Sequence, residues 1–321
     1  MKRAGFYLGI LACLMVATLA MPMTSAMAQT DEFQFEVAAL YIQEKNDDFK
    51  FQAYGGYAGY HFTPVPLSSL PWAEAAFLAR SSSITIGLIR TDYNLDFEGL
   101  GEITGNGYMV SGNIEFFVPG FPLYISADLI RMKTTLESTN FEQDSVNTDF
   151  SGRIGILPIQ GVLIGALYGR SVDKRDGEIP LYSVPIDEED TINYYGGFLK
   201  IVQPIGGSMA FGFDLTAQRI NTTSKDNTEG ESEETSDTNV EGMLAFYPVA
   251  QFGIGATLEI QRGDTIGSEG NTYGIAAIFF PMPNVGIMFS YNRFKPANDV
   301  DDKNYKILES NSFDVSVRAR F

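Results

Sequence analysis

The sequence predicts an all-β protein, a transmembrane antiparallel up-and-down β-barrel of about fourteen strands. Three observations favour this fold class. Apolar and polar residues alternate along many short segments, as they do in strands with two unlike faces. Short turns that contain proline alternate along the chain with long acidic loops. After the N-terminal segment, no stretch approaches the roughly 20 apolar residues that a membrane helix needs.

Residues 1–28 have the features of an export signal. A basic start and an apolar core precede Ala26-Met27-Ala28, which is a small-residue cleavage site. We expect cleavage after Ala28, which leaves residues 29–321 as one barrel domain. The only cysteine, Cys13, leaves with the signal, so we expect no disulfide. The alternative, a lipoprotein attached through Cys13, would leave only twelve residues for the signal.

The chain is strongly acidic, with 40 Asp and Glu against 22 Lys and Arg and a net charge of −18. Two of the basic residues lie in the signal, which leaves 20 against 40 and a charge of −20 in the exported part. Such a chain has no basic stripe to neutralise phosphates, so we expect no nucleic-acid partner. With 45% hydrophobic residues, it is also too apolar for a disordered acidic tail.

The final nine residues, 313–321, are apolar at every odd position and polar at every even one, and similar alternation recurs at 33–41, 150–156 and 252–261. An even number of strands places both ends of the domain at the short turns, as in bacterial barrels. Twelve or sixteen strands would fit if residues 63–95 are misassigned. In order along the chain, we expect strands over 33–43, 49–62, 81–93, 107–118, 122–134, 146–157, 161–172, 191–203, 208–220, 239–248, 250–262, 271–281, 284–295 and 311–321.

The connections between strands differ in length at the two ends of the predicted barrel. Proline has no N–H to give to a strand ladder, so it belongs in the turns. Loops at the other end are long and acidic, at 173–190, 222–238 and 297–310. A secreted β-sandwich is the alternative, but it does not explain the one-sided loop lengths. Five prolines mark the short turns at intervals of 33 to 46 residues: Pro119, Pro158, Pro204, Pro248 and Pro281.

Together these features resemble the porin-like class of outer-membrane β-barrel proteins of Gram-negative bacteria. The resemblance rests on the signal cleavage site, the alternating final strand and the terminal Phe321, which is similar to the assembly signal of that class. It implies a place in the outer membrane, contact with the barrel-assembly machinery and with lipopolysaccharide, and a channel function. No residue motif selects one family within the class.

Residues 69–80 break the strand pattern and predict a short helix on the short-turn side. Ser69 offers a cap, Pro71 stands early, strong helix formers follow, and the stretch ends on a basic residue. One interpretation is a short interfacial helix or a ragged extension of the third strand. The other is a helix folded into the lumen as a plug or constriction. The residues of this candidate plug are Trp72, Glu74, Phe77 and Arg80.

A charge that faces lipid at the bilayer centre costs about 2–4 kcal/mol, so charged positions on the strands should face the lumen. The acidic candidates are Glu36, Glu115, Asp128, Asp214, Glu241, Glu259 and Asp314. The basic candidates are Arg153, Lys200, Arg318 and Arg320. This surplus of acids and the acidic loops favour cations mildly. The alternative is that the charges pair across the lumen and only hold its shape. Small residues such as Gly253 would leave room for water.

We expect neither an enzyme nor a metal or cofactor site. The only histidine, His61, lies among aromatic residues near the short-turn end and fits a belt residue at the membrane interface better than a general base. Acidic runs such as 187–190 lack the spacing of a calcium loop. Divalent ions held loosely at these runs could bridge them to lipopolysaccharide.

Three functions remain open from the sequence. The first is a porin-like channel for passive diffusion of small hydrophilic solutes or ions. The second is a closed or plugged barrel that acts in surface adhesion or as a structural protein through its acidic loops. The third is a transporter of hydrophobic compounds, which needs an apolar lumen. Glu115, Arg153 and Glu259 argue against this third function.

Overall fold

The computed structural model describes residues 32–46, 49–67, 71–97, 101–138, 141–179, 184–206, 209–226, 231–263, 269–296 and 309–321. The predicted signal with its cleavage site lies outside these ranges, as does nearly all of the predicted loop 297–310. No helix within the described ranges has the length and apolar character needed to cross a membrane.

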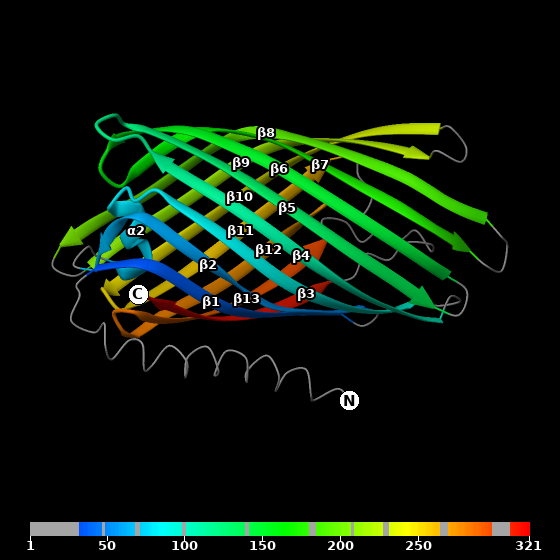
Figure 1. The fold of residues 1–321 in the computed structure, drawn as a ribbon, viewed down its shortest axis with the longest axis horizontal. Helices are drawn as coiled ribbons and strands as arrows, with labels where there is room; N and C mark the ends of the chain where they lie inside the picture. The colour runs from blue at the N-terminus through cyan, green and yellow to red at the C-terminus, as the bar shows by residue number, and fades with distance from the viewer. Residues whose placement is uncertain are drawn as a thin grey trace.

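Fourteen strands form one closed antiparallel barrel, which confirms the predicted fold class (Figure 1). Every strand pairs with its neighbours in the chain, and β1 pairs with β14 to close the ring. The strands are β1 (Glu32–Lys45), β2 (Phe49–Pro66), β3 (Ser83–Phe97), β4 (Gly101–Phe117), β5 (Leu123–Ser138), β6 (Phe141–Ile159), β7 (Val162–Ile179), β8 (Val184–Gly206), β9 (Met209–Asp226), β10 (Glu231–Val249), β11 (Phe252–Gly263), β12 (Gly270–Met282), β13 (Val285–Pro296) and β14 (Ser310–Arg320).

The two ends of the barrel differ. At one end, called the short-turn end, tight turns such as residues 118–122 and 160–161 join the strands. At the other end the hairpins formed by β5 to β10 project furthest, to the right in Figure 1. There the strands run through segments predicted as loops, because Asp173 still pairs with Asp190. Thr222 likewise pairs with Thr235. Both faces of these extensions are polar, so the alternation that marks the apolar part of each strand is missing.

Large apolar side chains cover the outside of the barrel between its two ends. Ile86, Ile154, Ile254 and Ile275 come from four different strands, and each is more than half exposed. A soluble monomer rarely exposes so extensive an apolar surface, whereas a barrel that faces lipid needs one.

The inside of the short-turn end is packed with side chains rather than hollow. One buried cluster contains Phe117, Tyr124, Leu163 and Phe198 from β4, β5, β7 and β8. A second cluster contains Phe33. The alternation over residues 33–41, with Glu36 facing the lumen, would place Phe33 on the outer face, and this placement is wrong. The register between β1 and β2 shifts between Phe33 and Phe35, so the alternation is interrupted there. Phe33 is 2% exposed and Phe35 is 55% exposed.

Candidate functional site

The segment between β2 and β3 lies inside the barrel at the short-turn end, where α2 is drawn in Figure 1. It contains a 3₁₀ turn, η1 (Trp72–Glu74), followed by one turn of helix, α2 (Ala75–Leu78). Ala75 is fully buried against the cluster of β1 and β2 residues that includes Phe33. Phe77 packs on the opposite cluster around Phe198 of β8. The segment, called the lumenal segment (residues 71–82), therefore contacts walls on different sides of the barrel. It is neither an interfacial helix nor an extension of β3.

Glu74 attaches the lumenal segment to β8 and β10. The Tyr247 hydroxyl donates a hydrogen bond to Glu74 Oε1 over 3.0 Å. Lys200 Nζ lies 2.9 Å from Glu74 Oε2 and 3.6 Å from Asp214 Oδ2 on β9. The same ammonium group lies 5.1 Å from the centre of the Phe77 ring. One carboxylate thus links the segment to two strands of the wall.

Trp72 attaches the segment to β12, to β14 and to the turn between β10 and β11. Its carbonyl oxygen accepts a hydrogen bond of 2.8 Å from Arg320 Nη1 of β14. Its backbone N–H donates to the carbonyl of Ala250 over 3.2 Å. Its ring meets the edge of Phe280 of β12, with 6.0 Å between the ring centres. Arg80, in contrast, is exposed at the end of the segment and has a positive φ of 53°.

Three of the four predicted basic residues form ion pairs near the lumenal segment. Arg320 Nε lies 2.8 Å from Glu36 Oε2, and Arg318 Nε lies 3.6 Å from Glu36 Oε1. Arg320 is 2% exposed and stacks between the rings of Phe33 and Phe280. Together with the Lys200 cluster, these pairs match the interpretation in which lumen charges hold the shape of the barrel. That interpretation describes the short-turn end.

Four of the remaining predicted acids of the lumen have neutral hydrogen-bond partners. Glu115 accepts from the Tyr124 hydroxyl over 2.8 Å, and Asp128 accepts from Asn113 Nδ2 over 2.6 Å. Glu259 accepts from Asn239 Nδ2 over 3.0 Å. Asp314 accepts from the hydroxyl of Ser290. Glu241 is exposed to the lumen directly opposite Glu259 in the β10–β11 ladder. None of these five carboxylates forms an ion pair within the described part of the chain.

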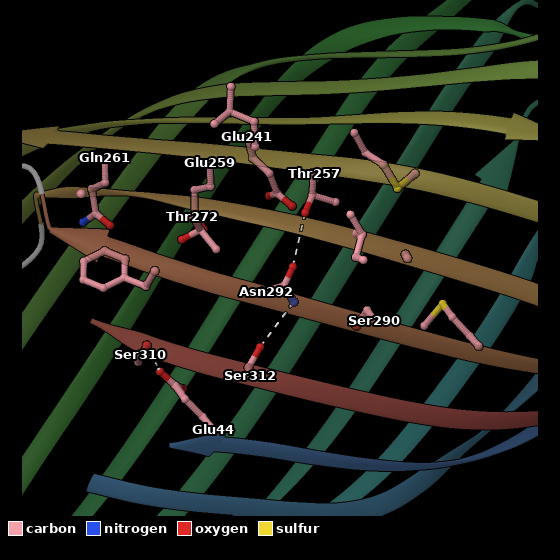
Figure 2. Close-up of a pocket in the computed structure, with 17 residues that line it drawn as sticks. Glu44, Glu241, Thr257, Glu259, Gln261, Thr272, Ser290, Asn292, Ser310 and Ser312 are labelled. Carbon is pink, nitrogen blue, oxygen red and sulfur yellow. Dashed lines mark hydrogen bonds between the residues drawn. The ribbon is translucent and has the colours of Figure 1, made fainter. Parts of the chain in front are cut away.

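Within the part of the barrel that the structure describes, two cavities of the lumen share Glu241 and Met243 in their linings. The smaller, of 470 Å³, lies against the lumenal segment and is lined by Glu74 and Phe77 among others. The larger, of 610 Å³, lies beyond it and is lined mainly by β10 to β14 (Figure 2). In Figure 2, hydrogen bonds link Asn292 to Thr257 and to Ser312, over 3.3 Å and 3.4 Å. Polar side chains of β11, β13 and β14 therefore form part of the wall of the larger cavity.

Several aromatic residues of the lumen were not predicted as site residues. The Tyr247 ring covers Gly253, where a Cβ atom would lie 2.6 Å from the ring carbon Cδ1. The expectation that Gly253 leaves room for water is therefore wrong. Tyr194 likewise covers Gly169, and its hydroxyl donates to Asp149 over 3.0 Å. The sequence signal that could have identified these aromatic residues is a glycine at an inner-face position of the neighbouring strand, because it leaves space for the ring.

His61 also lies inside rather than in an outer belt. It shares the inner face of β2 with Gly59, and its ring meets the edge of Phe33 at 5.2 Å. His61 is 9% exposed, so its predicted position in a belt at the membrane interface is wrong. The bulge that turns Phe33 inward provides this contact. Across the described ranges, no three His, Cys, Asp or Glu side chains come together as a candidate metal site.

No family model matches the sequence, and no curated protein matches it. Solved structures do resemble it. Outer membrane protein Omp33 of Acinetobacter baumannii is 16% identical, with a TM-score of 0.52, over 91% of this chain and 100% of that one. A FadL homologue of Pseudomonas aeruginosa is 9% identical over 90% of each chain, with a TM-score of 0.49. The translocator domain of autotransporter NalP from Neisseria meningitidis is 12% identical over 96% of this chain and 95% of that domain, with a TM-score of 0.46. The similarity to Omp33 shows that the chain has the fold of a Gram-negative outer-membrane β-barrel protein, as its sequence predicted.

Proposed function

We propose that this protein is an outer-membrane channel for the passive diffusion of small hydrophilic solutes, with a mild preference for cations. The surplus of carboxylates over basic groups along the lumen carries the proposal. Glu115, Asp128, Glu241, Glu259 and Asp314 have no basic partner among the described residues. In a lumen with low-dielectric walls, such fixed negative charge concentrates cations and repels anions.

The proposed location follows from the outside of the barrel. The exposed apolar side chains would face the lipid, the short-turn end would face the periplasm, and the acidic hairpins would face outward. Lipopolysaccharide would contact those hairpins through divalent cations. Phe321 closes the barrel, because its carbonyl accepts from the N–H groups of Gln34 and Phe35 over 2.7 and 2.9 Å. We propose that the assembly machinery binds Phe321 before this seam forms.

The lumenal segment would constrict the channel at its periplasmic end. It reaches β1, β8, β10, β12 and β14 through the contacts of Ala75, Lys200, Tyr247, Phe280 and Arg320. A solute would pass only where this segment leaves a gap or moves. The proposed channel is therefore one of small conductance.

The test is the reversal potential of single channels in a planar bilayer under a salt gradient. Wild-type protein should show discrete current steps and a potential that favours cations. Glu241→Gln should move the potential toward zero, because it removes a lumen charge. Asp144→Asn is the matched control, since Asp144 lies at the long-hairpin end and pairs with Lys133 at 3.2 Å on the outer face. Equal potentials for wild type and Glu241→Gln would contradict the charge assignment.

The contacts of the lumenal segment also favour a second candidate, a closed barrel that acts at the cell surface. In that case correctly folded protein should carry no current, and replacing residues 71–80 with a flexible Gly-Ser linker should produce it. A channel should carry current before the replacement and more current after it. The two candidates therefore differ in the wild-type trace.

A further inference from the structure

Arg153 differs from the other basic groups of the lumen. It projects from β6 into the 470 Å³ cavity, and its guanidinium carbon lies 5.9 Å from the centre of the Phe198 ring. Lys200 lines the same cavity, but its ammonium group is held by Glu74 and Asp214. Arg153 forms no ion pair with a described residue and is exposed to the cavity. A guanidinium group that has no ion-pair partner and is exposed to a cavity can bind the carboxylate of a solute.

Glu241 lines the same cavity from β10 and forms neither an ion pair nor a hydrogen bond with a described residue. Its register partner, Glu259, adds a second negative charge beside it. A solute that is only an anion would be attracted by Arg153 and repelled by these carboxylates. A solute that is only a cation would meet the opposite conflict. A molecule that carries both charges close together satisfies both sides of the cavity.

The floor of this cavity is apolar. Phe77 of the lumenal segment and Leu163 and Phe198 of the wall line it beside the charged groups. Its volume of 470 Å³ lies within the roughly 300–1,000 Å³ typical of small-molecule sites. The shared lining residues Glu241 and Met243 connect it to the larger cavity, which provides a route of entry.

We propose that this cavity binds a small zwitterion with an apolar side chain, of the kind represented by an apolar α-amino acid. The carboxylate of the solute binds Arg153, its ammonium group faces Glu241, and its side chain lies on Phe77 and Phe198. This inference deepens the proposed function, because it names the class of solute that pauses in the lumen. It rests on that function only for the access of solute to the cavity.

The experiment is equilibrium dialysis of labelled L-leucine against the folded full-length barrel in detergent micelles. Isovalerate and isoamylamine keep the branched apolar chain but carry only one of the two charges, so they should compete at least tenfold more weakly than unlabelled leucine. Arg153→Gln and Glu241→Gln should each weaken leucine binding at least tenfold. Arg131→Gln and Asp144→Asn are the matched controls, because both side chains lie on the outer face of the barrel. These controls should bind leucine as the wild type does.

Binding that is absent, or unchanged by Arg153→Gln, overturns the proposal. Equal competition by isovalerate overturns it in favour of a simple anion site. Bilayer current measured on the same preparations separates this result from the proposed channel function. Current without leucine binding contradicts the zwitterion site alone, whereas leucine binding without current supports the site and contradicts the open channel.

Discussion

Glu74 and Lys200 form an ion pair inside the barrel, with 2.9 Å between Oε2 and Nζ. Both side chains are largely withdrawn from solvent, at 12% and 26% exposure. Glu74 belongs to the segment that enters the lumen, and Lys200 belongs to the wall. This ion pair must therefore break before the lumenal segment can leave its position.

Replacing Glu74 with Gln should free the lumenal segment. The change removes a charge-assisted contact worth about 1.5–3 kcal/mol. Because every 1.4 kcal/mol is a factor of ten, the fraction of time that a channel spends in its larger conducting state should rise at least tenfold. Single-channel recording measures that fraction. Arg80→Gln changes a charge in the same segment but at an exposed side chain, so it should leave the fraction unchanged. Identical traces for all three proteins would show that the Glu74 contact does not hold a gate.

Trp72 is the only tryptophan of the chain and lies in the lumenal segment, so its fluorescence reports on that segment directly. In wild-type protein the indole ring packs against Phe280, and iodide should quench it slowly. In Glu74→Gln the quenching constant should increase, because the segment spends more time away from the wall. Quenching that is fast already in the wild type would contradict the packed position of Trp72.

The barrel and the inward direction of the predicted lumen charges could be predicted from the sequence, because side chains alternate between the two faces of a strand with a period of two residues. In this barrel one face is apolar and the other is polar. The inward position of Glu259 and the outward position of Ile254 follow from that alternation alone. Phe33 could not be placed this way, because the register shift at its pairing with β2 interrupts the period. The ends of β7 and β8 were missed for a related reason, since both of their faces are polar beyond the apolar band.

The lumenal segment illustrates a second limit. Its helix formers and Pro71 predict a short helix, but its place depends on partners far away in the chain. Glu74 meets Tyr247, which is 173 positions later, and Trp72 meets Arg320, which is 248 positions later. The sequence of the segment itself does not indicate which distant residues it will contact. Only the closure of the barrel brings them together.

Gly253 should be intolerant of any side chain, because the Tyr247 ring occupies its inner face. In Gly253→Ala the new methyl group would meet ring carbons at 2.6 Å and displace the tyrosine from Glu74. Overpacking of this kind costs about 1–3 kcal/mol, so the urea midpoint of unfolding in lipid vesicles should fall. Gly112→Ala is the control, since its methyl group would meet no atom within 4 Å. Similar midpoints for the two variants would show that Tyr247 can move without cost. Trp72 quenching should increase in Gly253→Ala only.

Glu36 should contribute more to stability than any exposed carboxylate of the barrel. It is the carboxylate that pairs with both Arg318 and Arg320 at the seam between β1 and β14. Glu36→Gln would leave the buried guanidinium group of Arg320 and the partly buried one of Arg318 without their shared ion-pair partner. Breaking a buried ion pair in this way costs about 3–5 kcal/mol.

The matched control is Asp92→Asn, because Asp92 pairs with Arg90 at 3.5 Å while both side chains are well exposed. An exposed pair of this kind is worth at most about 1 kcal/mol. The free energy of unfolding, measured with urea in the same vesicles, should therefore fall several times further in Glu36→Gln than in Asp92→Asn. Equal losses would mean that water reaches the seam and screens its charges. In that case water would also compete for the hydrogen bond from Arg320 to the carbonyl of Trp72. The attachment of the lumenal segment to β14 would then be weak.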